Sequence, residues 1–167
     1  IQALDGGWIG LSGAFSSWTS WTLSGAGSAF DVCDVTSLSG ATVSVSDGLT
    51  LSFCSLTSLE NVNLYASSGG QILCPVATSY TGYDYGHTTI EASGGGSRID
   101  LSYLETLSGG GYHYAGAGNH RYYWTYINAL DGGQVDLAGA LSANGSGNGI
   151  TITVDGPGSI LEVAGIT

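Results

Sequence analysis

The sequence predicts an all-β protein, a right-handed parallel β-helix (β-solenoid) of about seven coils of ~21 residues each. Three observations lead to this prediction: a repeat that recurs along the whole chain, an alternation of apolar and polar residues with a period of two, and glycines at matching places in each repeat. In a solenoid each coil buries its apolar face against its neighbours. The right hand follows from the preference of parallel crossover connections.

Each repeat begins with a short alternating strand and a glycine turn. The segments 1–11, 64–74 and 127–137 can be laid over one another, and each has two glycines at its centre. Glycine adopts a positive φ without steric cost, and Asp-Gly pairs such as Asp5-Gly6 and Asp131-Gly132 favour a turn. We therefore expect a tight corner at this place in each coil.

A second strand follows the turn and supplies the core. Its inward residues lie at i and i+2, as Ile99 and Leu101 do on either side of Asp100, whereas a helix would need i, i+3 and i+4. The predicted inward pairs are Ile9/Leu11, Phe30/Val32, Leu51/Phe53, Ile72/Cys74, Ile99/Leu101, Val135/Leu137 and Leu161/Val163. The first four pairs recur every 21 residues, and the later intervals are 27, 36 and 26 residues.

The coil ends in a tail that reads Leu-x-x-Leu in the middle copies, and the extra residues of the longer coils enter just after it. These insertions fall at 81–87, 108–124 and 142–149, so one edge of the solenoid should carry all the loops. Surface loops on a rigid scaffold are frequent binding sites. The first two insertions are rich in rings, and the predicted ligand-binding residues are Tyr83, Tyr85, Tyr112, Tyr114, Tyr122 and Trp124.

Two interpretations of these rings stay open. Tyr and Trp supply rigid, amphipathic contact area that suits sugar rings or a protein partner. Alternatively, the rings fold back and pack over the solenoid, because a long loop needs a small core of its own.

Carboxylates occupy the outward position between the inward residues in the last three coils. Asp100, Asp136 and Glu162 should stack about 4.8 Å apart. Neighbouring carboxylates can act as an acid–base pair in a polysaccharide lyase or glycoside hydrolase, or they can bind Ca²⁺, which is the one cofactor we consider. The alternative is a solvated acidic face, with Arg98 offsetting part of its charge. No nucleophile elbow, phosphate loop or HExxH motif is present.

The three cysteines are interpreted from their register. Cys74 falls at an inward position and is expected to be a buried free thiol. Cys33 and Cys54 share one repeat position on neighbouring coils, so their separation permits a disulfide. Two stacked free thiols remain the alternative.

Composition excludes several classes of function. The net charge is −11, with only two basic residues, so the chain lacks the cations that nucleic-acid binding needs. No apolar run approaches 18 residues, so we expect no membrane insertion. The chain starts within a strand and stops within a tail. We therefore expect residues 1–167 to be a single solenoid domain that is an excerpt of a longer solenoid, or else a subunit that self-associates end to end into a filament.

The copies NVNLYASSGGQILCPVATSYTG, TTIEASGGGSRIDLSYLETLSGG and INALDGGQVDLAGALS resemble the repeats of very large secreted bacterial surface proteins, notably of the planctomycete type. Such regions resemble adhesin and pectate-lyase-like right-handed β-helices. The resemblance covers nearly the whole chain and implies an extracellular or cell-surface location with a structural or adhesive role. It carries over no catalytic residues. The function predicted is thus a structural or adhesive element, with a polysaccharide-cleaving enzyme and a filament subunit as the alternatives.

Overall fold

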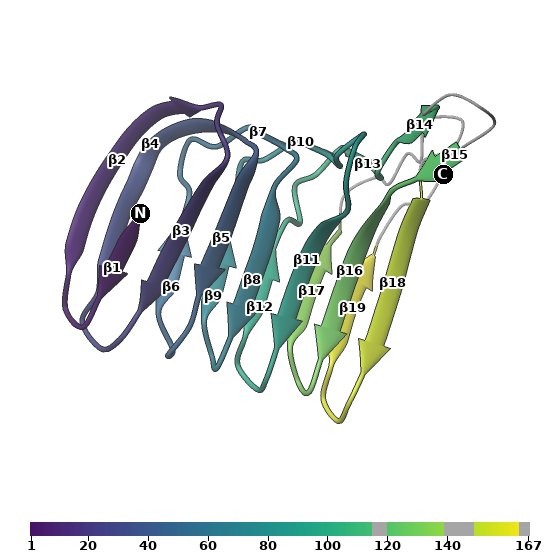
Figure 1. The fold of residues 1–167 in the computed structure, drawn as a ribbon. Helices are drawn as coiled ribbons and strands as arrows, with labels where there is room; N and C mark the ends of the chain where they lie inside the picture. The colour runs from purple at the N-terminus through teal and green to yellow at the C-terminus, as the bar shows by residue number, and fades with distance from the viewer. Residues whose placement is uncertain (115–119, 139–148, 164–167) are drawn as a thin grey trace.

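The chain forms a parallel β-solenoid of about six turns, close to the seven coils predicted (Figure 1). The computed structural model describes residues 1–114, 120–138 and 149–163. The fold class is thereby confirmed. No helix that could cross a membrane occurs among the described residues.

Three parallel sheets make up the sides of the solenoid. We name the three sheets A, B and C, and their strands are given below. In the regular coils the chain passes through sheet C, then sheet B, then sheet A. Sheet A contains β1 (Gln2–Leu4), β3 (Thr19–Ser24), β5 (Ala41–Val45), β8 (Asn63–Ser67), β11 (Thr88–Ser93), β16 (Trp124–Leu130) and β18 (Gly149–Asp155). Sheet B contains β2 (Trp8–Phe15), β4 (Ala29–Ser39), β7 (Ser58–Glu60), β10 (Ser79–Thr81) and β13 (Thr106–Ser108). Sheet C contains β6 (Thr50–Ser52), β9 (Gln71–Leu73), β12 (Arg98–Asp100), β17 (Gln134–Leu137) and β19 (Ile160–Val163).

The first two coils depart from this pattern because β2 and β4 run continuously around the corner that separates sheets C and B elsewhere. Their pairing shifts register between Gly10 and Ser12 and again between Gly13 and Ala14. Such β-bulges bend a strand and strengthen its twist. The long curved ribbons of β2 and β4 are visible in Figure 1.

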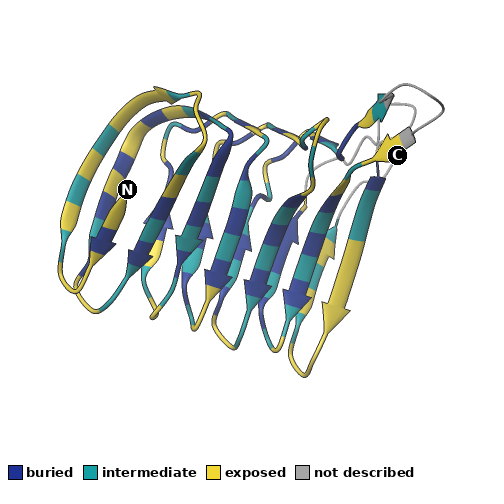
Figure 2. Cartoon of the chain, viewed as in Figure 1, coloured by how far each residue is buried: buried dark blue, intermediate teal, exposed yellow. Residues whose placement is uncertain are grey.

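The predicted inward residues form the core. Leu51, Ile72, Ile99 and Val135 are adjacent in register and fully buried. The second members of these pairs, from Phe53 to Leu137, are buried as well, and Figure 2 shows the alternation of buried and less buried residues along the middle strands of sheet A. The outermost pairs, Ile9/Leu11 and Leu161/Val163, are only partly buried and pack against the core from its two ends.

Turns from sheet A to sheet C stack through serines that sequence reasoning did not identify, of which Ser28 and Ser97 are buried. The Ser97 hydroxyl accepts a hydrogen bond from the Gly69 amide of the preceding coil at 3.0 Å and donates to the Ser93 carbonyl at 2.7 Å. Ser28 and Ser159 make the equivalent two contacts: each accepts a hydrogen bond from a glycine amide of the preceding coil and donates to the carbonyl four residues earlier. Each of these serines ends a Gly-x-Gly-Ser sequence. Hydrogen bonds of the serine hydroxyls therefore connect successive glycine turns.

Candidate functional site

The corner between sheets C and B carries the predicted acidic ladder. The backbone register places Asp100 beside Asp136, and Asp136 beside Glu162, as the repeat predicted. Asp136 is nevertheless buried, with 7% of its surface exposed, whereas Glu162 is exposed. The alternative interpretation, a solvated acidic face, therefore does not hold for Asp136, which is buried and lies beside Arg98.

Each buried or half-buried carboxylate at this corner already has partners. Arg98 Nη2 lies 2.8 Å from Asp100 Oδ2 and 3.3 Å from Asp136 Oδ2. The second oxygen of Asp100 accepts a hydrogen bond from the Ser102 amide at 3.1 Å, and that of Asp136 accepts one from the Ala138 amide at 3.3 Å. These bonds to the residue two positions later are Asx turns, which shape the corner.

Asp31 shows that this use of the outward carboxylate is part of the repeat. Its Oδ1 accepts a hydrogen bond from the Cys33 amide at 3.4 Å, the same i to i+2 contact. A general acid or a Ca²⁺ ligand needs oxygens that face a substrate or an ion. In the described part of the chain, no three His, Cys, Asp or Glu side chains lie where they could jointly hold a metal ion. The geometry of this corner thus supports a structural role.

The same corner contains the predicted cysteine pair. Cys33 and Cys54 are joined in the structure, with their Cα atoms 4.4 Å apart. Cys74 is free and buried. Burial, with a smaller contribution from the negative charge of Asp100, raises the pKa of the Cys74 thiol to about 12. We call this region, with Asp31, Asp100, Asp136, Arg98 and the Cys33–Cys54 pair, the carboxylate corner.

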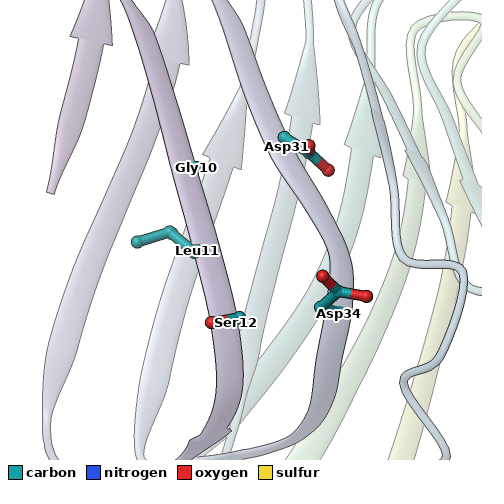
Figure 3. Close-up of a pocket in the computed structure, with 5 residues that line it drawn as sticks. All are labelled: Gly10, Leu11, Ser12, Asp31 and Asp34. Atoms are coloured by element: carbon teal, nitrogen blue, oxygen red, sulfur yellow. The ribbon is translucent and has the colours of Figure 1, made fainter.

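A small pocket of about 210 Å³ lies between β2 and β4, apart from the Asp100–Glu162 ladder. Figure 3 shows Asp31 and Asp34 on β4 beside Gly10, Leu11 and Ser12 on β2. The lining contains no His or Arg that could complement the two carboxylates. Its polar side chains are the Ser12 hydroxyl and the two carboxylates, and Asp31 already accepts the hydrogen bond from the Cys33 amide.

The first two insertions emerge at the corner between sheets B and A, on one edge of the solenoid as predicted. The first is the loop of residues 82–87 between β10 and β11. The second lies between β13 and β16 and contains an antiparallel hairpin, β14 (Tyr112–Tyr114) and β15 (His120–Tyr122), where the sequence had indicated only a loop. Tyr112 pairs with Tyr122 and His113 with Arg121, because cross-strand pairing satisfies backbone groups that a long loop would leave open. The third predicted insertion lies largely outside the described residues.

A glycine run holds the two insertions together. The Gly111 amide donates to the Tyr83 carbonyl at 3.4 Å, and the Tyr123 amide donates to the Gly111 carbonyl at 2.9 Å. A Cβ on Gly110 would lie only 2.5 Å from the Tyr123 backbone, so a larger residue cannot fit there. The run Gly109–Gly111 therefore serves close backbone packing.

Ring contacts connect the insertions. Tyr83 and Tyr85 lie 5.9 Å apart by ring centroid, and Tyr85 lies 4.8 Å from His113 of the hairpin. Tyr112 and Tyr122 face each other across the hairpin at 5.3 Å. The two insertions are therefore neighbours, as their common corner had indicated.

His87 joins the first insertion to strand β16. Its Nδ1 accepts a hydrogen bond from the Trp124 amide at 3.0 Å, and its ring lies 5.6 Å from Tyr123 and 5.4 Å from Tyr126. The Trp124 indole covers the backbone of Gly149 on the next strand, since a Cβ on that glycine would overlap it. Some rings thus pack on the solenoid, as the alternative interpretation expected.

Several rings, Trp124 among them, keep a substantial part of their surface open to solvent. The exposed fractions are 59% for Tyr85, 54% for Tyr122, 40% for Tyr112 and 39% for Trp124. Tyr83 is half-buried, and the side chain of Tyr114 lies outside the described part of the chain. Each interpretation therefore describes some of the rings: part of them pack on the solenoid, and part of them are exposed.

Trp18, which was not among the predicted site residues, extends this group of rings. It lies between β2 and β3, its ring centroid is 5.1 Å from that of Tyr83, and 67% of its surface is exposed. The sequence did contain a signal for Trp18: it lies just before a strand of sheet A, at the position where the insertions enter in later coils. We call Trp18, Tyr83, Tyr85, Tyr112, Tyr122 and Trp124, together with His87 and His113, the aromatic edge.

The fold and these two corners define the class of protein as a parallel β-solenoid with an aromatic edge. No protein-family model matches the sequence, and neither a curated protein nor a solved structure is significantly similar to it.

Proposed function

We propose that the protein is an extracellular structural or adhesive element, in a bacterial cell surface or matrix, which contacts polysaccharide or protein through its aromatic edge. The observation that carries this proposal is the exposure of several neighbouring rings on a rigid scaffold. Large exposed aromatic groups are typical of contact surfaces, since they supply area at low entropic cost. An oxidising location is consistent with the Cys33–Cys54 pair.

Binding by the wild type and by a Tyr122→Ala/Trp124→Ala double variant tests the proposal on a glycan array and on immobilised extracellular proteins. We expect the double variant to lose binding, because both rings are exposed at the edge. Tyr103→Ala is the matched control, since Tyr103 is 63% exposed and follows β12 at the carboxylate corner. Equal binding by all three proteins would contradict the proposal.

The polysaccharide-cleaving alternative is tested separately. It requires catalysis by Asp100, Asp136 or Glu162, whereas two of these carboxylates are engaged by Arg98 and by backbone amides. Polysaccharide cleavage by the wild type that disappears in Asp136→Asn, with the aromatic edge intact, would replace our proposal. Binding of Ca²⁺ at this ladder and end-to-end self-association stay predictions, for calorimetry and for sedimentation velocity respectively.

A further inference from the structure

The rings of the aromatic edge form a track that follows the solenoid axis. Successive ring contacts link Trp18 to Tyr83, Tyr83 to Tyr85, and Tyr85 to His113, at 5.1, 5.9 and 4.8 Å. Trp18 precedes β3 and Tyr83 precedes β11, and β5 and β8 lie between these strands in sheet A. At a strand spacing of about 4.8 Å, β3 and β11 are roughly 14 Å apart along the axis. The Trp18 and Tyr83 side chains bridge this distance, so that their ring centroids lie 5.1 Å apart.

One row of side chains beside the track is polar and uncharged. A row of outward side chains on sheet A starts two residues after Trp18 and consists of Ser20, Thr42, Asn63, Thr89 and Tyr126. Asn63 binds its neighbours on both sides, donating to Thr42 Oγ1 at 3.4 Å and accepting from the Thr89 amide at 2.8 Å. Tyr126 at the end of the row contacts His87 of the aromatic edge. Each of these coils therefore places a hydroxyl or amide group on sheet A near the aromatic edge.

This combination favours a sugar chain over a protein partner. Sugar rings present C–H faces to aromatic groups and hydroxyls to neighbouring polar side chains. The large exposed hydrophobic residues of the edge are all aromatic, whereas exposed aliphatic residues such as Val76, Ile152 and Val154 lie on other parts of the molecule. Aliphatic anchors of the kind that fill protein pockets are therefore missing from the described part of this edge.

The charge of the chain restricts the class of polysaccharide further. The chain has 13 acidic and 2 basic residues. Asp84 lies in the first insertion and Glu91 on β11, and Arg121 on β15 is the only Lys or Arg in the described part of the edge. An anionic polysaccharide would be repelled, because like charges oppose association. We infer that the aromatic edge binds an uncharged polysaccharide lying along the solenoid axis, with Trp18 at one end of the track. This inference rests on the proposed function and adds the ligand class, the direction of the ligand and a binding residue.

The test measures binding of soluble polysaccharides by affinity gel electrophoresis and isothermal titration calorimetry. The uncharged probes are hydroxyethylcellulose, laminarin and galactomannan, and the anionic probes are alginate and polygalacturonate. The chain offers a matched control, since Trp8 and Trp18 are 68% and 67% exposed, but Trp8 begins β2 and lies outside the ring contacts described above. We expect binding to an uncharged probe that is unaffected by added salt, since no charge pair contributes to it.

Trp18→Ala should weaken that binding about tenfold, Trp18→Phe should retain most of it, and Trp8→Ala should leave it unchanged. Equal losses in Trp18→Ala and Trp8→Ala, or no loss in either, would refute the role of Trp18. Binding to the anionic probes alone, to protein alone, or to none of the probes would overturn the inference. The proposed function fails separately, if the Tyr122→Ala/Trp124→Ala variant binds every ligand as the wild type does.

Discussion

The carboxylate corner and the aromatic edge are two corners of one solenoid, and they use their outward side chains differently. At the carboxylate corner, Asp100 and Asp136 each bind both Arg98 and a backbone amide. At the aromatic edge, Tyr85 and Tyr122 contact other rings and still expose more than half of their surface.

This difference separates structural side chains from candidate binding side chains. A carboxylate that is already hydrogen-bonded and ion-paired stabilises the turn and has little left to offer a ligand. An exposed ring contributes little to folding, and its apolar faces remain available. Substitutions at the first corner should therefore lower stability, and substitutions at the second should lower binding.

The largest expected effect is at the cysteine pair of the carboxylate corner. A Cys33→Ser/Cys54→Ser variant should lose about 3 kcal/mol of unfolding free energy, because the cross-link closes a loop of 21 residues. Guanidinium chloride unfolding measures this loss. The intact mass of the native protein should be two hydrogens lower than that of the reduced protein. Equal masses would show that the corner holds two free thiols.

Removal of Arg98 should have the next largest effect. Arg98→Leu leaves the buried Asp136 carboxylate without its cation, and we expect a loss of roughly 2 kcal/mol, less than for a fully buried pair because Arg98 is partly exposed. Glu162→Gln is the control and should change stability little, since Glu162 is exposed. If both variants unfold at the same denaturant concentration as the wild type, the carboxylate corner has no structural role.

Alkaline pH should act through Cys74, which lies on the inner side of the carboxylate corner. Its pKa is raised to about 12 by burial and by Asp100, so the native thiol stays protonated while the unfolded thiol ionises near pH 9. The stabilising effect is complete below pH 9 and falls as the pH rises toward 12. At pH 10 the loss should be about 1.4 kcal/mol. Cys74→Ala should remove this component, so its stability should decline less between pH 8 and pH 10; parallel declines would refute the assignment.

The smallest effect on stability is expected at the aromatic edge. Tyr85→Ala and Tyr122→Ala should each change the unfolding free energy by no more than about 0.5 kcal/mol, as substitutions at exposed positions usually do. Thermal and chemical unfolding give the measurement. A loss of several kcal/mol would mean that these rings form a packed satellite core, and the contrast between the two corners would disappear.

The sequence by itself determined the fold class, the inward pairs such as Ile72/Cys74, and the corner at which the insertions leave the solenoid. It could do so because strand periodicity is local: each residue faces in or out according to its neighbours along the chain. Stacking by repeat position then placed Cys33 beside Cys54 and Asp100 beside Asp136.

Only the tertiary structure decided what those side chains touch. The ion pairs of Arg98, the Asx turns of Asp31 and Asp100, and the serine bridges depend on side-chain conformations that the repeat does not specify. The contact between Trp18 and Tyr83 joins residues 65 positions apart and crosses two intervening strands, so no local pattern encodes it. A period places residues on a face, but contacts between insertions arise only when separate coils pack together.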